Sequence, residues 1–180
     1  YFRQMEYYEI HTDVMEVDVS DKADYKGYFQ HIWEHAKLVE GHTYELEPEF
    51  HFLYLLTHIA KHISSSGAGI RMYMDIAVFI QHFGENLDWD YIQKELKTLC
   101  FEDFANMVLT VVWKYFHVQS PINLRPIEDQ ILEDFMEFTF AGGVFGHVGR
   151  DSGLIYLKNQ DRNEENVSRM GTFLRRLIAP

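Results

Sequence analysis

The sequence predicts a mainly helical protein, a bundle of about six to seven helices with a short N-terminal β element. From residue 21 onward, apolar residues recur at the three- and four-residue spacing of amphipathic helices, and clusters of glycine, proline and serine separate the segments. Before that point, aromatic and β-branched residues alternate with polar ones, as in a strand. With 180 residues, 47% of them hydrophobic, the chain is long enough for one sizeable core.

The β element is the segment Tyr7–Val14, whose alternation places Glu9 on its more polar face. A lone strand is not stable, because its backbone hydrogen bonds need a neighbour. No convincing neighbour follows in the chain apart from the short segment Thr43–Leu46. The sequence therefore predicts two unequal parts, a strand region over residues 1–20 and a helical domain over residues 21–180.

Three helices are expected in the first half of the helical domain. The first has apolar residues at helical spacing: Tyr25, Tyr28, Phe29, Ile32, Trp33 and Ala36. Pro48 suits the first turn of the second helix, and Glu49 is favourable at the positive end of its dipole. This helix extends to Ile63, and the Ser- and Gly-rich break at residues 64–69 separates it from a third helix, Ile70–Phe83.

The second half of the domain contains four more segments with helical apolar spacing: 89–99, Phe104–Phe116, Ile127–Phe140 and Glu164–Ile178. Asp88 is placed to cap the first of these. Five glycines between Gly142 and Gly153 predict a loop before the last. Cys100 has no basic neighbour in sequence and is expected to be a small core residue.

Composition limits the function. Sixteen basic and 28 acidic residues give a net charge of −12, which repels nucleic acid and anionic membranes, so a nucleic-acid partner is not expected. No segment approaches the roughly 18 apolar residues that cross a bilayer. One cysteine forms no internal disulfide and favours a cytoplasmic location. The chain opens without a methionine or a signal-type stretch, so we expect it to be cut from a longer protein.

The most informative stretch is His58-Ile-Ala-Lys61-His62, followed by Arg71 and Asp75, because it places ionisable groups on two otherwise apolar helices. Three interpretations are open. Two histidines four residues apart can share a zinc ion, although the metalloprotease pattern needs a glutamate directly after the first, where this chain has isoleucine. The histidines can instead be hydrogen-bonded in an aromatic-rich core. Lys61 and Arg71 can also form a wall that binds a phosphate.

Two other patterns in the chain resemble sites of known chemistry. Arg71 and Asp75 lie four residues apart and can pair on a helix that is apolar on most sides, so at least one of them is expected to be partly buried. The run from Gly142 to Gly146 lacks the Gly-Lys-Ser/Thr ending of a phosphate-binding loop and does not follow a strand. We interpret it as a corner of the chain.

Several motifs occur in a fixed order along the chain: Tyr8-Glu-Ile-His11, Leu53-Tyr-Leu-Leu56, His58-Ile-Ala-Lys-His62, Gly69-Ile-Arg71, Asp75-Ile76, Asp88-Trp89, Gly143-Val-Phe-Gly146 and Leu177-Ile-Ala-Pro180. This ordered set covers nearly the whole chain and resembles the C-terminal part of a bacterial family of uncharacterised nucleotidyltransferases. In that family a polymerase-β-like α/β domain precedes a helical region. The resemblance implies that residues 1–20 are a residual strand of that α/β domain.

The resemblance also implies an activity, the transfer of NMP from an NTP to an unknown acceptor with Mg²⁺ or Mn²⁺. Such enzymes hold the ions with an Asp-x-Asp/Glu pair after a Gly-Ser turn and with a third carboxylate on a later strand. Glu9 matches the third carboxylate, which implies a catalytic, metal-binding role. The residues that would face the nucleotide or acceptor are His58, Lys61, His62, Arg71 and Asp75, the last orienting Arg71. The Gly-Ser-anchored pair is missing from the chain, so we expect an incomplete enzyme, inactive alone.

Two other functions remain open at the level of sequence. The helical part could be a non-catalytic module that binds an acceptor or a partner protein, or it could be a histidine-rich zinc protein. The unpaired edge of the predicted strand could also be covered by a second copy of the chain, which would give a homodimer.

Overall fold

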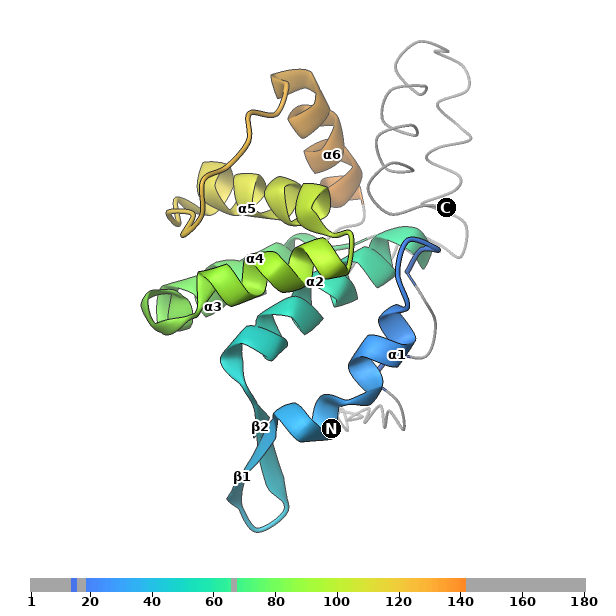
Figure 1. The fold of residues 1–180 in the computed structure, drawn as a ribbon. Helices are drawn as coiled ribbons and strands as arrows, with labels where there is room; N and C mark the ends of the chain where they lie inside the picture. Colours follow the sequence, from blue (N-terminus) through green and yellow to red (C-terminus); the bar gives the residue numbers. More distant parts are fainter. Residues whose placement is uncertain (1–13, 16–18, 66–67, 142–180) are drawn as a thin grey trace, which may run out of the picture.

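The computed structural model describes residues 14–15, 19–65 and 68–141, and this part of the protein is mainly helical (Figure 1). It contains six α-helices, two 3₁₀ turns and one two-stranded hairpin. The α-helices are α1 (Tyr25–Gln30), α2 (Pro48–Ser65), α3 (Ile70–Phe83), α4 (Trp89–Thr98), α5 (Glu102–Phe116) and α6 (Asp129–Ala141). The prediction of a mainly helical fold is confirmed. The predicted strand Tyr7–Val14, the loop Gly142–Gly153 and the helix Glu164–Ile178 lie outside the described residues.

Helix α5 is at the centre of the core. All nine residues from Phe104 to Val112 are buried, so this part of the helix is covered on every side. It packs against α2, α3 and α4, and α6 covers it from the opposite side (Figure 1). The continuous apolar sequence of the segment explains the position, because a helix that is hydrophobic all round is stable in water only when its neighbours surround it.

The first predicted helix is shorter than expected. The side chain of Asp24 caps α1 by accepting a hydrogen bond from the backbone N–H of Gly27 at 2.7 Å, but the helix ends at Gln30. A 3₁₀ turn, η1 (Ile32–His35), follows. The prediction that Trp33 and Ala36 continue the helix is wrong: Trp33 is 71% exposed, and Ala36 begins a strand.

That strand, β1 (Ala36–Glu40), pairs with β2 (Thr43–Leu46) in an antiparallel hairpin that projects from the helices (Figure 1). Gly41 has a φ of +55° and opens the two-residue loop, a conformation that glycine adopts without steric cost. The expected neighbour of Thr43–Leu46 was Tyr7–Val14; within the described residues its neighbour is β1. Leu38, opposite Tyr44, remains exposed on one face of the hairpin.

The structure tests three further predictions. Pro48 begins α2, and the carboxylate of Asp88 accepts a hydrogen bond from the backbone N–H of Tyr91 at the start of α4, so both predicted helix starts are confirmed. Cys100 was expected in the core, and this is wrong. Cys100 lies in the turn between α4 and α5 with a φ of +54°, and its side chain is exposed while Leu99 and Phe101 on either side are buried.

Candidate functional site

The predicted histidine pair lies in the C-terminal half of α2. The Nε2 atoms of His58 and His62 are 3.2 Å apart, within hydrogen-bond distance, and the two ring centroids are 4.5 Å apart. Helical geometry explains the contact, because residues four apart lie one above the other on the same face. Both imidazoles and the neighbouring Lys61 are half-buried. One histidine can therefore donate a hydrogen bond to the other at the surface of the core.

Arg71 and Asp75 lie in the first two turns of α3, just past the short connection from α2. Along the chain, they therefore follow the end of α2 that carries the histidine pair. Both side chains are exposed, so the prediction that one of them is partly buried is wrong. The reason is that α3 carries surplus apolar residues: Tyr73 and Ile76 face the core, while Met74, 47% exposed, shares the outward side with the charged pair. Glu9 lies outside the described residues.

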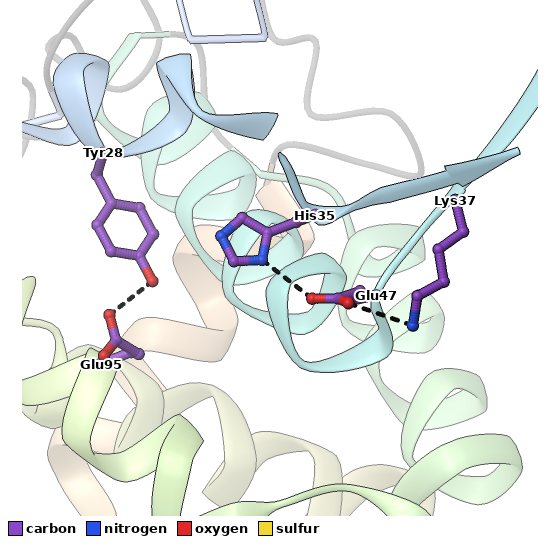
Figure 2. Close-up of polar contacts among 5 residues, drawn as sticks. All are labelled: Tyr28, His35, Lys37, Glu47 and Glu95. Carbon is purple, nitrogen blue, oxygen red and sulfur yellow. Dashed lines mark hydrogen bonds and ion pairs between the residues drawn. The ribbon is translucent and has the colours of Figure 1, made fainter. Parts of the chain in front are cut away.

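A second polar cluster lies at the opposite end of α2, where the hairpin joins it (Figure 2). Glu47 accepts from His35 Nδ1 at 3.1 Å through one oxygen and pairs with Lys37 Nζ at 3.2 Å through the other. The backbone N–H of Glu47 also donates to the carbonyl of His35 at 2.8 Å. These contacts from His35 and then Lys37 lower the pKa of Glu47, which keeps it ionised. His35 is thus held with its second ring nitrogen directed away from the carboxylate.

Tyr28 and Glu95 extend this cluster (Figure 2). The hydroxyl of Tyr28 donates to the carboxylate of Glu95 on α4 at 2.8 Å. Burial raises the pKa of Tyr28, and the hydrogen bond to Glu95 raises it further, so the phenol stays protonated. The ring of Phe50 lies nearly parallel to both Tyr28 and His35, at 5.8 and 4.2 Å between centroids, and joins the two halves of the cluster.

A continuous series of ring contacts connects the two ends of α2. The rings, each within 6 Å of the next, are His35, Phe50, Phe29, Tyr54, His58 and His62. Phe29 belongs to α1 and contacts Phe50 and Tyr54, so α1 covers the N-terminal half of this face of α2. Phe29 and Phe50 are buried, so the middle of the series belongs to the core and joins the two polar clusters.

Sequence reasoning missed the second cluster. His35 and Glu47 are 12 residues apart, and Tyr28 and Glu95 are 67 apart, so no local spacing connects them. The signal that could have found the first contact is the hairpin itself, because a two-residue loop at Gly41 brings the residues on either side of it together in register.

The described residues do not form a metal site by themselves. Across residues 14–15, 19–65 and 68–141 there is no group of three or more His, Cys, Asp or Glu side chains placed to hold one ion. His58 and His62 contact each other directly, which agrees with the interpretation of hydrogen-bonded histidines beside the core.

None of the described helices is long and apolar enough to cross a membrane.

His51, on the α3 side of α2, provides a test of the packing. Burial lowers its pKa, and its ring meets Phe79 edge-on at 5.2 Å. In the unfolded chain a histidine takes up a proton below about pH 6.5, whereas the lowered pKa keeps folded His51 neutral there. The folded state therefore loses stability as the pH falls below that value. We expect the free energy of unfolding, measured with urea, to fall less between about pH 7 and about pH 5 in His51→Phe than in the unchanged protein. His82→Phe, at an exposed position of α3, is the control; equal losses in both variants would contradict the prediction.

Comparison with protein families matches residues 3–117 to a model described as uncharacterised nucleotidyltransferase. The matched segment covers nearly two thirds of the chain and includes the candidate residues from Glu9 to Glu95, so both clusters lie inside it. Neither the curated proteins nor the solved structures contain a match. Because the family model covers more than half of the chain, this protein belongs to the family of uncharacterised nucleotidyltransferases.

Proposed function

We propose that this protein takes part in the transfer of NMP from an NTP to an acceptor, and that the C-terminal half of α2 and the start of α3 form the helical wall of the transfer site. The observation that carries the proposal is that the family-matched segment contains the half-buried His58, Lys61 and His62 of α2 and the exposed Arg71 of α3. Membership of the family makes an NTP the expected substrate. The acceptor is a molecule with a nucleophilic group, in practice a hydroxyl, that replaces pyrophosphate on the α-phosphorus.

In this proposal Lys61 and Arg71, with the histidine pair, form a cationic corner that holds the triphosphate. Lys61 and Arg71 carry the positive charge there, and His58 and His62 supply ring N–H donors. A protein with a net charge of −12 needs such a local set of donors to attract an anion as strongly charged as an NTP. Asp75, four residues after Arg71 on α3, is placed to orient the guanidinium.

The metal-binding part of the proposal rests on the family. Divalent ions such as Mg²⁺ or Mn²⁺, when bound, neutralise phosphate charge and activate the acceptor hydroxyl. Glu9 is the residue of this chain that we assign to them. The sequence contains no Gly-Ser-anchored Asp-x-Asp pair, and in this proposal that pair belongs to residues other than these 180. The metal site that this chain forms alone is then incomplete.

Direct titration of NTPs tests the proposal. We expect the natural full-length protein to bind one of the four NTPs in the presence of Mg²⁺, and Lys61→Met or Arg71→Met to weaken binding by about 10- to 100-fold, the equivalent of one charged hydrogen bond. Lys97→Met, at an exposed position of α4, should leave the affinity unchanged. Absence of binding by all four NTPs, or equal affinity in the three variants, would overturn the proposed wall.

One observation favours a second function, a non-catalytic module that binds a partner protein. The projecting hairpin exposes Leu38, Val39 and Tyr44, together with Trp33, which packs edge-on against Tyr44 at 5.5 Å. Exposed apolar side chains gathered on one element are typical of interaction surfaces. If this is the function, the same titration should detect no NTP binding.

A further inference from the structure

A groove of about 930 Å³ lies between the C-terminal half of α5, the connection over residues 117–128 and the start of α6. It is separate from the wall along α2, and its lining extends beyond the family-matched segment, which ends at residue 117. Six of its lining residues carry the chemistry discussed below: Trp113, Lys114, His117, Arg125, Ile127 and Leu132. The volume lies within the range of small-molecule sites, about 300–1,000 Å³.

The outer wall of the groove is held in place by specific contacts. The side-chain amide of Asn106, on α5, donates to the carbonyl of Arg125 at 3.1 Å and accepts from its backbone N–H at 2.8 Å. The guanidinium of Arg125 also pairs with Asp103 at 2.7 Å. His117 ends α5 in the left-handed conformation and turns the chain back along the helix. The wall is therefore preformed, which lowers the entropic cost of binding a ligand.

The lining combines an apolar floor with positive charge. Ile127 and the buried Leu132 form apolar surface, and Trp113, 53% exposed, adds an indole ring to the lining. The lining contains two basic side chains, Lys114 and Arg125, and one acidic side chain, Asp129, in a protein of net charge −12; Arg125 is paired with Asp103, outside the lining. This combination suits a flat apolar ring system that carries a negative group.

Lys114 is the cation that a ligand can reach. Its ammonium pairs with Asp129 at 3.1 Å across the two walls, and the Asp129 side chain is 86% exposed. Surface pairs of this kind contribute little, about 0–1 kcal/mol, so a bound anion can replace Asp129 at small cost. The guanidinium of Arg125 is instead engaged by Asp103, eleven positions before Lys114 on the same helix.

We propose that this groove binds a small organic anion with a flat apolar body, which stacks on Trp113 and pairs with Lys114. The proposal is independent of nucleotidyl transfer, because none of its residues belongs to the wall along α2. Anilinonaphthalene sulfonate has this chemistry and becomes fluorescent when it binds, and phenylnaphthylamine is its neutral counterpart. The two dyes therefore separate the contribution of charge from that of apolar surface.

The experiment titrates both dyes into the full-length protein and its variants. We expect one equivalent of the sulfonate to bind, with Lys114→Met weakening it about 10-fold or more, the scale of a charged hydrogen bond, while leaving the neutral dye unaffected. Trp113→Ala should weaken both dyes. Lys97→Met, outside the groove, and Trp33→Ser, on the exposed hairpin, should change neither. All four side chains are exposed or half-exposed, so these variants are expected to fold, which circular dichroism checks.

Two results would overturn the proposal. Equal sulfonate affinity in Lys114→Met and Lys97→Met would exclude a contact between Lys114 and the anion. Loss of dye binding in Trp33→Ser but not in Trp113→Ala would mean that the dye binds to the hairpin instead of the groove. Competition then identifies the source of the natural anion. Displacement of the sulfonate dye by ATP would indicate a nucleotide, and displacement by indole acetate but not by ATP would indicate an aromatic carboxylate.

Discussion

Replacing Phe135 by alanine is expected to lower the free energy of unfolding by about 3–5 kcal/mol, the usual cost of removing a fully buried aromatic side chain. Phe135 is 0% exposed and lies on α6, with its ring edge-on to Tyr73 of α3 at 6.0 Å. Its loss would leave a cavity lined by α3, α5 and α6. The helix lies beyond the family-matched residues, so the prediction asks whether the core is continuous across that limit.

Urea unfolding followed by circular dichroism measures the effect, and Tyr115→Ala is the matched control. Tyr115 is an aromatic residue of α5 that is 39% exposed, so its removal should cost clearly less stability than the removal of Phe135. Equal slopes of free energy against urea in both variants would show that the comparison is of stability alone. A small effect of Phe135→Ala, comparable to that of the control, would mean that α6 is not part of the cooperative core.

The long helices could be predicted from the sequence because their signals are local. Pro48 and Asp88 mark helix starts through their own backbone and side-chain chemistry, and the apolar segment from Phe104 to Val112 indicates a buried central helix. Each of these signals lies within one or two turns of the element that it specifies. The tertiary structure did not override them.

The segment around the hairpin could not be predicted in the same way. Ile32, Trp33 and Ala36 have helical spacing, but the pairing of β1 with β2 depends on Gly41 and on residues up to ten positions away. Local spacing cannot decide between a helix and a strand when a turn residue changes the partner. For the same reason the contact between His35 and Glu47 was missed, while the spacing of His58 and His62 already placed them on one helix face.

The face of α3 that is exposed could not be predicted from the sequence either. Arg71 and Asp75 were expected to be partly buried because their helix is apolar, yet α3 exposes Met74 and Val78 as well. Hydrophobicity along a helix predicts that one face is buried, but which of several apolar faces is covered depends on the neighbours. In α3 the covered face is the one that meets α5 and α2. The roles assigned to Arg71 and Asp75 in nucleotide binding remain predictions.

Glu9→Gln is expected to slow nucleotidyl transfer by about 10³-fold, because the proposal makes Glu9 a metal ligand. Loss of such a ligand removes about 4 kcal/mol of transition-state stabilisation, and each step of about 1.36 kcal/mol lowers the rate about tenfold. The substitution keeps the size of the side chain and removes its charge. Release of pyrophosphate from the NTP measures the rate without a known acceptor, since water can replace the acceptor hydroxyl when the bond to the α-phosphorus breaks. The natural full-length protein with Mg²⁺ is the system for this measurement.

Glu85→Gln, an exposed glutamate of the 3₁₀ turn η2 (Gly84–Asn86), is the matched control and should keep the full rate. Binding of the NTP without added divalent ions separates the possible causes of a slow variant. Because Glu9 is assigned to the ions and the corner around Lys61 to the phosphates, Glu9→Gln should retain that metal-free affinity, whereas Lys61→Met should lose it. A Glu9→Gln protein that releases pyrophosphate at the rate of the control would exclude Glu9 as a metal ligand while leaving the phosphate wall on α2 in place.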